Sequence, residues 1–542
     1  MATTSARGAR MRHLRRSFVA LVATASIIGL ASCTVVTPGD PGVVDVTLNI
    51  NTVGANTHPI SPLIYGSNSN RNLASNKQTV LRMGGNRWTA YNWENNASNA
   101  GSDWCFQNDG YLSSSNTPAD AVKPTIDQAT AAGAAAIVTV PIVGYVAYDK
   151  NGGCDVRSSG ANYLDTRFRR NHPTKGSALT TTPNATDADV YQDEYVNWLK
   201  VNEAGANIYF SLDNEPDLWS ATHAEVHPNA VTYAELAQKN VDYAKAIKGV
   251  LPNAKVLGPV NYGFNGFETL QNAPDAGGRN FLDYYLDQMK AADTANGKRL
   301  IDYLDLHWYP EATGGGVRIT GADTGAAVVA AREQAPRSLW DPSYVENSWI
   351  SNPGQYNYGA IKLIPRMKDR FAAHYPGTQL AITEWNYGGG DHISGAIASA
   401  DALGIFGQQG VGLATLWELN GNESYTYAAF RAFRNYDGAG AQFGDTSVDA
   451  SSSDVATSTV YASKSSADPN KVTIVATNKA TTTKKAGIKI TCAVGFSRAK
   501  VYTITAAGGA NVVAQADLTA VSQNAFNYTM PAQSVSVIVP QP

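Results

Sequence analysis

The sequence predicts an α/β fold, namely a (β/α)8 TIM barrel with an appended β-sandwich domain. Across residues 62–440, eight short apolar runs alternate with helix-like segments. Strands that alternate with helices pair in parallel, and eight such units close into a barrel. From residue 441 onward, Ser, Thr, Val and Ala dominate, and alternating runs recur with no helical pattern between them, which is typical of a β-sandwich. We therefore expect a barrel over residues 62–440 and a sandwich over residues 441–542.

The expected elements follow the apolar periodicity. The expected barrel strands are Leu63–Gly66, Val80–Gly84, Ala135–Pro141, Ile208–Asp213, Lys255–Gly258, Tyr303–His307, Leu380–Thr383 and Leu413–Trp417. The expected helices include Thr125–Ala134, Ala188–Asn202, Thr232–Leu251, Phe281–Thr294, Tyr358–Ala373 and Ser394–Gln408. The expected sandwich strands are Thr457–Ala462, Lys471–Thr477, Ala486–Cys492, Lys500–Ile504 and Ser534–Val539. The alternating run Val46–Asn51 has no place in the barrel, so we expect residues 46–61 to add an N-terminal strand to the sandwich.

Residues 1–33 have the pattern of an export signal. Five arginines precede a short apolar stretch, Phe18–Leu30, which is followed by the tetrapeptide LASC ending at Cys33. This tetrapeptide resembles a bacterial lipobox, in which Cys33 would be lipidated. An ordinary signal peptide cleaved nearby is the alternative, and the Arg15–Arg16 pair leaves the Sec and twin-arginine routes both open. We expect an exported protein, either a lipoprotein at the bacterial cell surface or a secreted one, with residues 34–45 as a tether.

The charge of the exported chain indicates which partners suit it. Removing the five arginines of residues 1–32 from the 42 basic residues leaves 37 against 45 acidic residues. A net charge near −8 argues against nucleic acid or another acidic polymer and fits a neutral polysaccharide. We expect contact with a membrane only through a lipid anchor at Cys33, and we expect a monomer.

The remaining cysteines suggest one disulfide. Cys105 and Cys154 both lie in loop sequence rich in Gly, Asn and Asp, and an oxidising compartment permits a bond between them. The alternative is that these two and Cys492 are free thiols. No Cys/His cluster has the spacing of a zinc site, and the sequence leaves metal content unknown.

Two glutamates occupy the positions where barrel enzymes place their chemistry. Glu215 follows the fourth expected strand, and Glu384 follows the seventh. Side chains just beyond the C-terminal ends of barrel strands converge over one mouth of the barrel. Two carboxylates there suit the cleavage of a glycosidic bond, which needs a proton donor and a second carboxylate facing the anomeric carbon.

The neighbours of each glutamate suggest its role. Glu215 lies between Asn214 and the Pro216 turn, close to Trp219, and apolar surroundings would keep it protonated as general acid. Asn214 could donate a hydrogen bond to a sugar hydroxyl. Glu384 is then the nucleophile. A surface ion pair is the plainer explanation of any single glutamate at a strand end.

Glu94 and Glu418 are rival carboxylates near other strand ends. We rank them lower because neither lies in an Asn-Glu-Pro turn or a Thr-Glu-Trp strand end.

Aromatic and imidazole side chains gather near the same strand ends. Aromatic faces stack on sugar rings, although several of these residues could equally belong to the core. The expected substrate-binding residues are Asn214, Trp88, Trp93, Trp219, His307, Trp308, Tyr309, Trp385, Tyr387 and Trp417. The long irregular stretch over residues 147–188 follows the third expected strand, so we expect it to form a wall of the substrate cleft.

The chain resembles glycoside hydrolase family 44. The resemblance rests on LRMGGNRWTAYNWENN at residues 81–96, DNEPDLW at 213–219, TH at 222–223, DPSYVE at 341–346 and TEWNYG at 383–388. It implies a (β/α)8 barrel with a β-sandwich and an endo-acting β-1,4-glucanase or xyloglucanase with Glu215 as acid/base and Glu384 as nucleophile of a retaining mechanism. It implies no cofactor for catalysis. It allows a structural calcium ion without identifying its ligands.

Two other functions stay open at this point. An exo-acting barrel glycosidase, of the arabinofuranosidase or xylosidase type, would need a closed pocket in place of an open cleft. A non-catalytic surface lipoprotein that captures glycans would use the same aromatic residues, although both carboxylates are present. Neither the preferred glucan nor the number of sugar subsites follows from the sequence.

Overall fold

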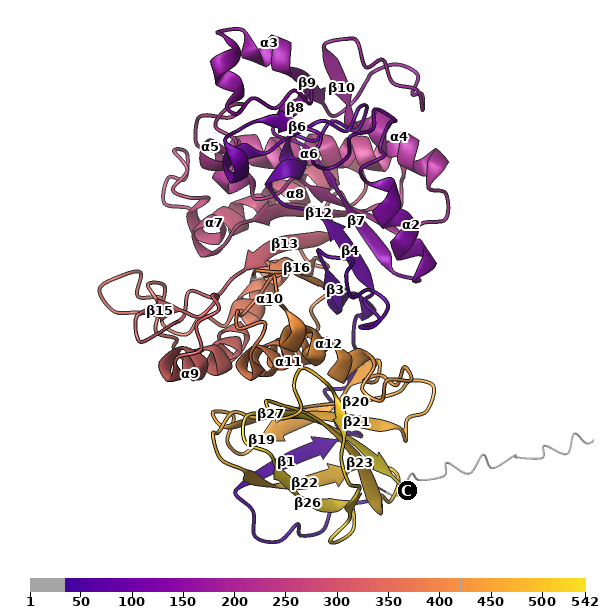
Figure 1. Cartoon of the computed structure of the whole chain (residues 1–542), viewed down its shortest axis with the longest axis vertical. Coiled ribbons are helices and arrows are strands. Elements are labelled where there is room, and N and C mark those ends of the chain that lie inside the picture. The colour runs from indigo at the N-terminus through magenta and orange to yellow at the C-terminus, as the bar shows by residue number, and fades with distance from the viewer. Residues whose placement is uncertain (1–34, 420) are drawn as a thin grey trace, which may run out of the picture. The chain divides into compact units, whose positions relative to one another are not determined.

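The computed structural model describes residues 35–419 and 421–542 (Figure 1). The expected export signal, including Cys33, lies outside these residues, so the lipobox stays a prediction. Much of the expected tether lies against the sandwich, because Val36 exchanges backbone hydrogen bonds of 2.7 and 3.2 Å with Cys492.

Eight parallel strands form a closed barrel in the order β11-β12-β13-β16-β17-β3-β4-β7. This confirms the predicted fold class. The strands are β3 (Gly66–Ser67), β4 (Val80–Met83), β7 (Ala135–Val140), β11 (Ile208–Leu212), β12 (Lys255–Asn261), β13 (Tyr303–Trp308), β16 (Gln379–Trp385) and β17 (Leu413–Leu416). Most of their residues are buried on both faces, as expected of parallel strands enclosed by helices.

Helices connect the barrel strands. They include α2 (Lys123–Ala131), α4 (Gln192–Asn202), α6 (Tyr233–Val250), α8 (Phe281–Asn296), α9 (Ala326–Gln334), α10 (Leu363–His374), α11 (Ile393–Gln408) and α12 (Ser424–Arg434). Six of these overlap the expected helices, whereas α9 and α12 were not expected.

The first barrel strand differs from the prediction. The apolar run at residues 63–66 begins as a short 3-10 helix, η1 (Pro62–Ile64), and only Gly66–Ser67 pairs as strand β3. The hydroxyl of Ser61 accepts a hydrogen bond from the Leu63 amide, and Pro62 occupies the first turn, where its missing N–H has no cost. The local capping of the turn outweighs the apolar pattern.

The sandwich consists of two sheets. One has the order β19-β1-β22-β26, and the main path of the other is β2-β18-β20-β21-β27-β23-β24. The short strands of this second sheet are β2 (His58–Pro59), β18 (Thr446–Ser447) and β24 (Val513–Ala514). Strand β1 (Val46–Asn51) pairs in parallel with β22 (Lys484–Thr491) and antiparallel with β19 (Asp449–Ser452). Figure 1 shows this indigo strand among the yellow strands of the C-terminal domain. The other principal strands are β20 (Ser458–Lys464), β21 (Val472–Asn478), β23 (Arg498–Thr505), β26 (Ala525–Met530) and β27 (Ser534–Gln541).

A buried ion pair joins the barrel to the sandwich. Helix α11 packs against β20, β21 and β27. At this contact, Lys479 lies 2.6 Å from Asp401, and both side chains are at most 2% exposed. Thr459 also donates a hydrogen bond to Asp401. The two domains therefore share a desolvated polar contact as well as apolar packing.

The long stretch after β7 has structure of its own. It contains β8 (Tyr145–Ala147), α3 (Tyr163–Arg167), β9 (Phe168–His172) and β10 (Asp189–Tyr191), and its strands form a small sheet in the order β10-β9-β8.

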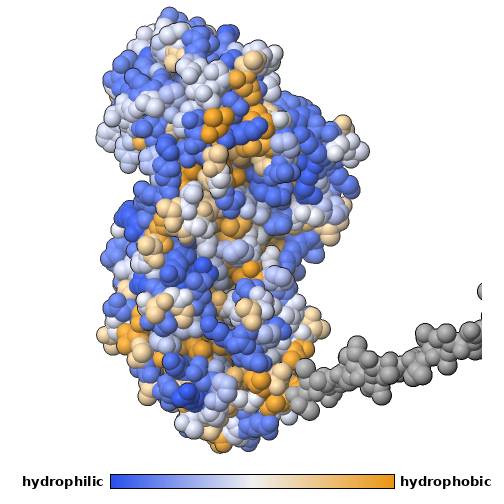
Figure 2. Space-filling view, turned by 90° about the vertical axis from the view of Figure 1, so that its right-hand side faces the viewer, coloured by the Kyte–Doolittle hydropathy of each residue, from blue (hydrophilic) through white to orange (hydrophobic). Residues whose placement is uncertain are grey.

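On the face shown in Figure 2, hydrophobic residues form small patches separated by hydrophilic ones. In the described part of the chain, no helix combines the length and the apolar character needed to cross a bilayer.

Candidate active site

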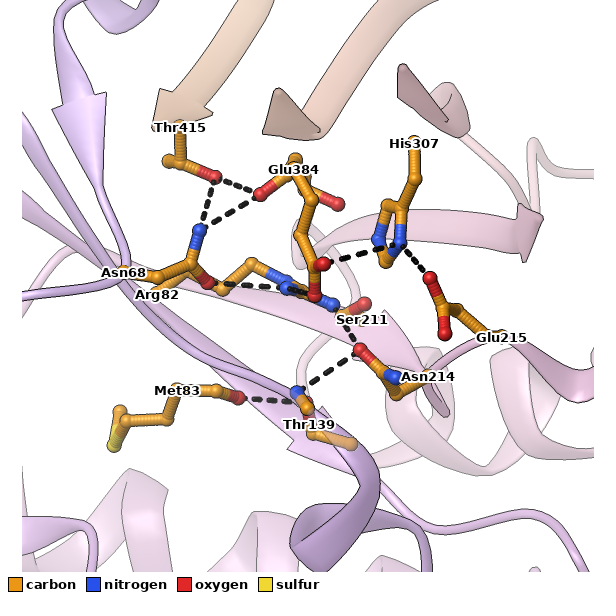
Figure 3. Close-up of polar contacts among 12 residues, drawn as sticks. Asn68, Arg82, Met83, Thr139, Ser211, Asn214, Glu215, His307, Glu384 and Thr415 are labelled. Carbon is orange, nitrogen blue, oxygen red and sulfur yellow. Dashed lines mark hydrogen bonds and ion pairs between the residues drawn. The ribbon is translucent and has the colours of Figure 1, made fainter. Parts of the chain in front are cut away.

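Arg82 organises the polar residues at the mouth of the barrel. It lies on β4 and is 2% exposed. Its Nη1 atom donates to Oε1 of Glu384 at 2.7 Å and to Oδ1 of Asn68 at 3.0 Å, and its Nη2 atom donates to Oδ1 of Asn214 at 2.8 Å (Figure 3). One guanidinium therefore fixes groups from three different strand ends, as its rigid fork of donors permits.

Glu384 lies near the end of β16 and receives two hydrogen bonds. Arg82 bonds to Oε1, and the Tyr309 hydroxyl donates to Oε2 at 2.8 Å. The carboxylate is only 5% exposed. A buried carboxylate that accepts hydrogen bonds from a guanidinium and a hydroxyl is held in one orientation.

Glu215 lies just beyond β11 in a left-handed backbone conformation, with φ 49° and ψ 53°. Few non-glycine residues adopt this conformation, and Pro216 begins the 3-10 helix η4 (Pro216–Leu218) directly after it. Burial raises the pKa of Glu215 to about 7. The nearby charge of Asp103 also raises it, while Arg82 opposes the shift. The carboxyl group can therefore hold a proton at near-neutral pH, as a general acid must.

His307 links the two glutamates. Its Nδ1 atom lies 2.8 Å from Oε1 of Glu215 and 3.5 Å from Oε2 of Glu384 (Figure 3). The ring is fully buried. Burial lowers the pKa of His307 to about 3, an effect that Arg82 reinforces and Glu384 opposes. The imidazole is therefore neutral, and a single proton can be shared between it and the Glu215 carboxyl.

The two carboxylates are close enough for a covalent mechanism. One oxygen of Glu215, one of Glu384 and a ring nitrogen of His307 lie within 4.8 Å of one another. Carboxyl groups about 5–5.5 Å apart are typical of retaining glycosidases, whereas roughly 6.5–9.5 Å leaves room for the water of an inverting one. One oxygen of each glutamate lies within 4.8 Å of one oxygen of the other, a proximity that favours the shorter class.

This cluster is the one grouping of three metal-ligating side chains among the described residues. Arg82 contacts one of its carboxylates, so a guanidinium already occupies the charge position that a cation would take. We therefore assign no metal to it, and none of the described residues is assigned to the calcium ion that the family resemblance allows.

Asn214 faces the cluster with its amide oxygen already engaged. The oxygen accepts hydrogen bonds from Arg82 and from the Gly85 amide at 2.9 Å. This arrangement leaves the Nδ2 group as the donor for a bound substrate.

Two cavities lie beside residues that bond to the cluster, because Asn68 lines one of them and Tyr309 lines the other. One, of about 840 Å³, is lined by residues that include Gly85, Trp88 and Trp417. The other, of about 170 Å³, is lined by residues that include Trp308 and Tyr309. Of the residues expected to bind substrate, Trp88, Trp308, Tyr309 and Trp417 therefore face hollows at the cleft, and His307 lies between the carboxylates.

Four residues expected to bind substrate lie in the core instead. Trp93, Trp219, Trp385 and Tyr387 are at most 1% exposed, and Trp93 stacks on Tyr195 with ring centroids 5.6 Å apart. A fully covered ring cannot stack on a sugar, so the expectation of direct contact is wrong for these four. Their position after strand ends does not reveal that the following turns fold them inward.

The rival carboxylates lie apart from the cluster. Burial, together with the negative charges of Asp187 and Glu194, raises the pKa of Glu94 to about 8. Glu418 pairs with Arg71 at 2.7 Å and accepts from Tyr427 at 2.6 Å. Neither bonds to the groups that hold Glu384.

Sequence reasoning missed two functional residues, Arg82 and Asp305. Asp305 is completely buried on β13 and accepts a hydrogen bond from the Thr383 hydroxyl at 2.8 Å. Burial raises the pKa of Asp305 to about 7 against the opposing charge of Arg82. A charged residue within an otherwise apolar strand run was the available signal, as in VLRM at residues 80–83.

The structure joins Cys105 and Cys154 by a disulfide whose Cα atoms are 5.3 Å apart. The bond connects the loop after η2 (Gly101–Trp104) to the long stretch after β7. Cys492 is a buried free thiol.

Comparison with known proteins identifies the family. The sequence profile of glycoside hydrolase family 44 matches residues 97–312. Endoglucanase A of Paenibacillus lautus is 42% identical over 519 residues, which cover 91% of this chain and 72% of that protein. The chain belongs to glycoside hydrolase family 44. It is therefore a glycoside hydrolase.

Two further proteins are similar over most of this chain. A xyloglucanase of Paenibacillus polymyxa from this family has a solved structure that matches with a TM-score of 0.87 and 39% identity, covering 92% of this chain and all of that one. The beta-mannanase/endoglucanase A of Caldicellulosiruptor saccharolyticus is 41% identical over 495 residues, which cover 85% of the present chain and 36% of that protein.

Proposed function

We propose that this family 44 chain is a retaining, endo-acting glycoside hydrolase that cleaves β-1,4-glucan backbones. The observation that carries the proposal is the separation within 4.8 Å of Glu215, His307 and Glu384 at the mouth of the barrel. That spacing supports direct attack by one carboxylate, with no room for a water molecule between sugar and base.

In the first half of the reaction, Glu384 attacks the anomeric carbon and forms a covalent ester with it. The bond from that carbon to the glycosidic oxygen breaks at the same time. Glu215 gives its proton to this oxygen, which leaves as a sugar hydroxyl. Burial favours the protonated form of Glu215 beforehand, and Arg82 and Tyr309 position the nucleophile.

In the second half, the ester is hydrolysed. Glu215, now a carboxylate, removes a proton from a water molecule, and the resulting oxygen attacks the same anomeric carbon. The bond to Glu384 breaks, and the product keeps the starting configuration because two inversions have occurred. The proton taken from water stays on Glu215, so the acid is restored without a change in net charge, and Nδ1 of His307, 2.8 Å from Oε1 of Glu215, holds the carboxyl group in place.

The relatives and the cleft support a glucan substrate. The Paenibacillus lautus relative is named an endoglucanase, and the Paenibacillus polymyxa xyloglucanase has been solved with xyloglucan. In the present chain, Trp88 and Trp417 line the larger of the two cavities, where their rings can stack on sugars. Asn214 offers its amide N–H to a sugar hydroxyl.

The chain is proposed to act outside the cytoplasm as a monomer. The basic and apolar pattern of residues 1–33 supports export, and the tetrapeptide ending at Cys33 supports a lipid anchor. Both carboxylates and Arg82 come from one chain, so the proposed site needs no residue from a second copy. Replacing Cys33 by Ser should release the protein from membranes, and a wild-type protein that fractionates without membranes would refute the anchor.

The first experiment follows viscosity and reducing ends together on xyloglucan, carboxymethylcellulose, mixed-linkage glucan and xylan. Endo-action predicts a rapid fall in viscosity while few ends are released. Slow release of monosaccharides would favour an exo-acting glycosidase. Binding without hydrolysis would favour glycan capture. Anomeric analysis of the first products by NMR tests retention.

A further inference from the structure

The larger cavity begins beside Asn68 and Gly85, which bond to Arg82 and Asn214 of the cluster, and extends outward from there. Its lining runs from Gly85 and Trp417 outward to Trp104 and Tyr111. These two aromatic side chains are 62% and 76% exposed. Exposed aromatic rings are costly to leave in water unless a partner covers them at times, and two of them along one hollow mark a binding surface.

A covalent link holds the loop that carries Trp104. The next residue, Cys105, forms the disulfide with Cys154. Cys105 and Phe106 have φ values of 41° and 57°, in the left-handed region that non-glycine residues rarely occupy. The guanidinium of Arg157, which lies close to Cys154 in the sequence, is 4.5 Å from the centroid of the Phe106 ring. The disulfide therefore restrains a loop whose own backbone preference opposes its conformation.

Tyr111 is positioned by a neighbouring ion pair. The Arg87 guanidinium lies 4.2 Å from the centroid of its ring and 2.5 Å from Asp109. The Tyr111 amide donates to the same Asp109 carboxylate at 3.0 Å. One face of the ring is thus covered by a planar cation, and the ring is fixed with the rest of its surface towards solvent.

Hydrogen-bonding groups accompany the two rings. Asp103, Gln107 and Asp109 line the same cavity. Asp103 accepts from Asn86 at 2.7 Å, and Gln107 donates to Asp109 at 2.9 Å. Apolar rings with fixed carboxylates between them are suited to a neutral sugar, whose flat face stacks while its hydroxyls donate.

We propose that Trp104 and Tyr111 form a distal sugar-binding platform, which binds the glucan chain several sugar units away from the bond that is cleaved, and that the Cys105–Cys154 disulfide holds Trp104 in its place there. This inference rests on the proposed glucanase function. A cavity of about 840 Å³ is near the upper end of the roughly 300–1,000 Å³ of small-ligand sites, so it has room for more than one sugar ring. The platform makes the enzyme selective for long chains.

The test measures KM and kcat for cello-oligosaccharides of increasing length, from cellotriose to cellohexaose, with the wild-type enzyme and with Trp104→Ala and Tyr111→Ala. Loss of one stacking contact should raise the ratio of KM for the longest to KM for the shortest substrate by about tenfold in Trp104→Ala. Trp104→Phe, which keeps a ring, should restore most of the ratio.

The matched control is Trp340→Ala. Trp340 lines a different cavity, of about 860 Å³, together with residues of β1 and β19. Its removal should leave the ratio unchanged. An unchanged KM ratio in Trp104→Ala would overturn the platform, whether KM rises equally for short and long substrates or does not change at all. Failure of the wild-type enzyme to cleave any glucan would instead refute the proposed function.

The disulfide provides a second test. The Cys105→Ser/Cys154→Ser double variant, and the wild-type enzyme treated with a thiol reductant, should both show the length-selective rise in KM. Cys492→Ser is the control, because that thiol is buried and forms no disulfide. If the double variant keeps the wild-type KM ratio and melting temperature, the disulfide does not position Trp104. The platform itself is still tested by Trp104→Ala.

Discussion

Nη1 of Arg82 lies 2.7 Å from Oε1 of Glu384, and the two side chains are 0% and 6% exposed. A pair so well shielded from water interacts strongly, and losing one partner leaves a buried charge without compensation. The same guanidinium also bonds to Asn214 through its other nitrogen. One side chain of β4 therefore aligns the proposed nucleophile and the amide proposed to bind substrate.

Arg82→Lys should lower kcat by about 10²- to 10³-fold while the far-ultraviolet circular dichroism stays unchanged. A lysine keeps the charge, but a single ammonium cannot bond to Glu384 and Asn214 at once with the geometry of a planar fork. Arg170→Lys, in an exposed ion pair with Asp189, is the control and should stay within about threefold of the wild-type rate. A nearly wild-type kcat in Arg82→Lys would contradict the alignment role.

Glu384→Ala should be inactive on polysaccharide, with kcat reduced on the order of 10⁴-fold or more. Removing the carboxylate leaves space next to the anomeric carbon, so added azide should restore cleavage of an aryl cellobioside. Azide attacks from the side of the missing carboxylate, the aryl oxygen leaves, and the product is the glycosyl azide of inverted configuration. Rescue without that product, or an active variant, would exclude Glu384 as nucleophile.

Glu215→Gln should abolish turnover of polysaccharide but leave binding intact. The amide is of the same size and cannot give a proton to the glycosidic oxygen, and general acid catalysis contributes about 10²- to 10⁴-fold. Aryl glycosides with good leaving groups need no proton for the first step, so they should retain a burst of aryl alcohol. Isothermal titration with cellohexaose checks binding, and equal losses on both substrate types would argue against the acid role.

The sequence allowed the barrel, the sandwich and the two glutamates to be predicted because each depends on local pattern. Parallel strands such as Ile208–Leu212 are apolar runs bounded by turn residues, and Glu215 follows one directly. The inward rotation of Trp93 and Trp385 could not be predicted, since it depends on turns and on partners distant in sequence. Strand β3 was misplaced because the capping of η1 competes with the apolar pattern.

Removing the buried cation at the barrel–sandwich contact should destabilise the protein. In Lys479→Met, Asp401 loses a partner at 2.6 Å in a site that is at most 2% exposed, and such a loss costs about 3–5 kcal/mol. Urea unfolding measures the change. Arg170→Met removes an exposed pair with Asp189 and should cost at most about 1 kcal/mol. If both variants lose equally little, the contact does not couple the domains.

The pH dependence of kcat/KM tests the assignment of the general acid. Burial raises the pKa of Glu215 to about 7, and the nearby negative charge of Asp103 adds to the shift. The reaction needs this carboxyl in its protonated form, so activity should be present below that pKa and should fall as pH rises through about 7.

In Asp103→Asn a negative charge is lost while the amide can still bond to Asn86. The protonated form of Glu215 is then less favoured, and the alkaline limb of the profile should move to lower pH. Asp189→Asn, which removes an acid outside the cluster, should leave the limb in place. A limb that stays fixed in Asp103→Asn, or one that lies near the pKa of an ordinary glutamate in the wild-type enzyme, would show that another group supplies the proton.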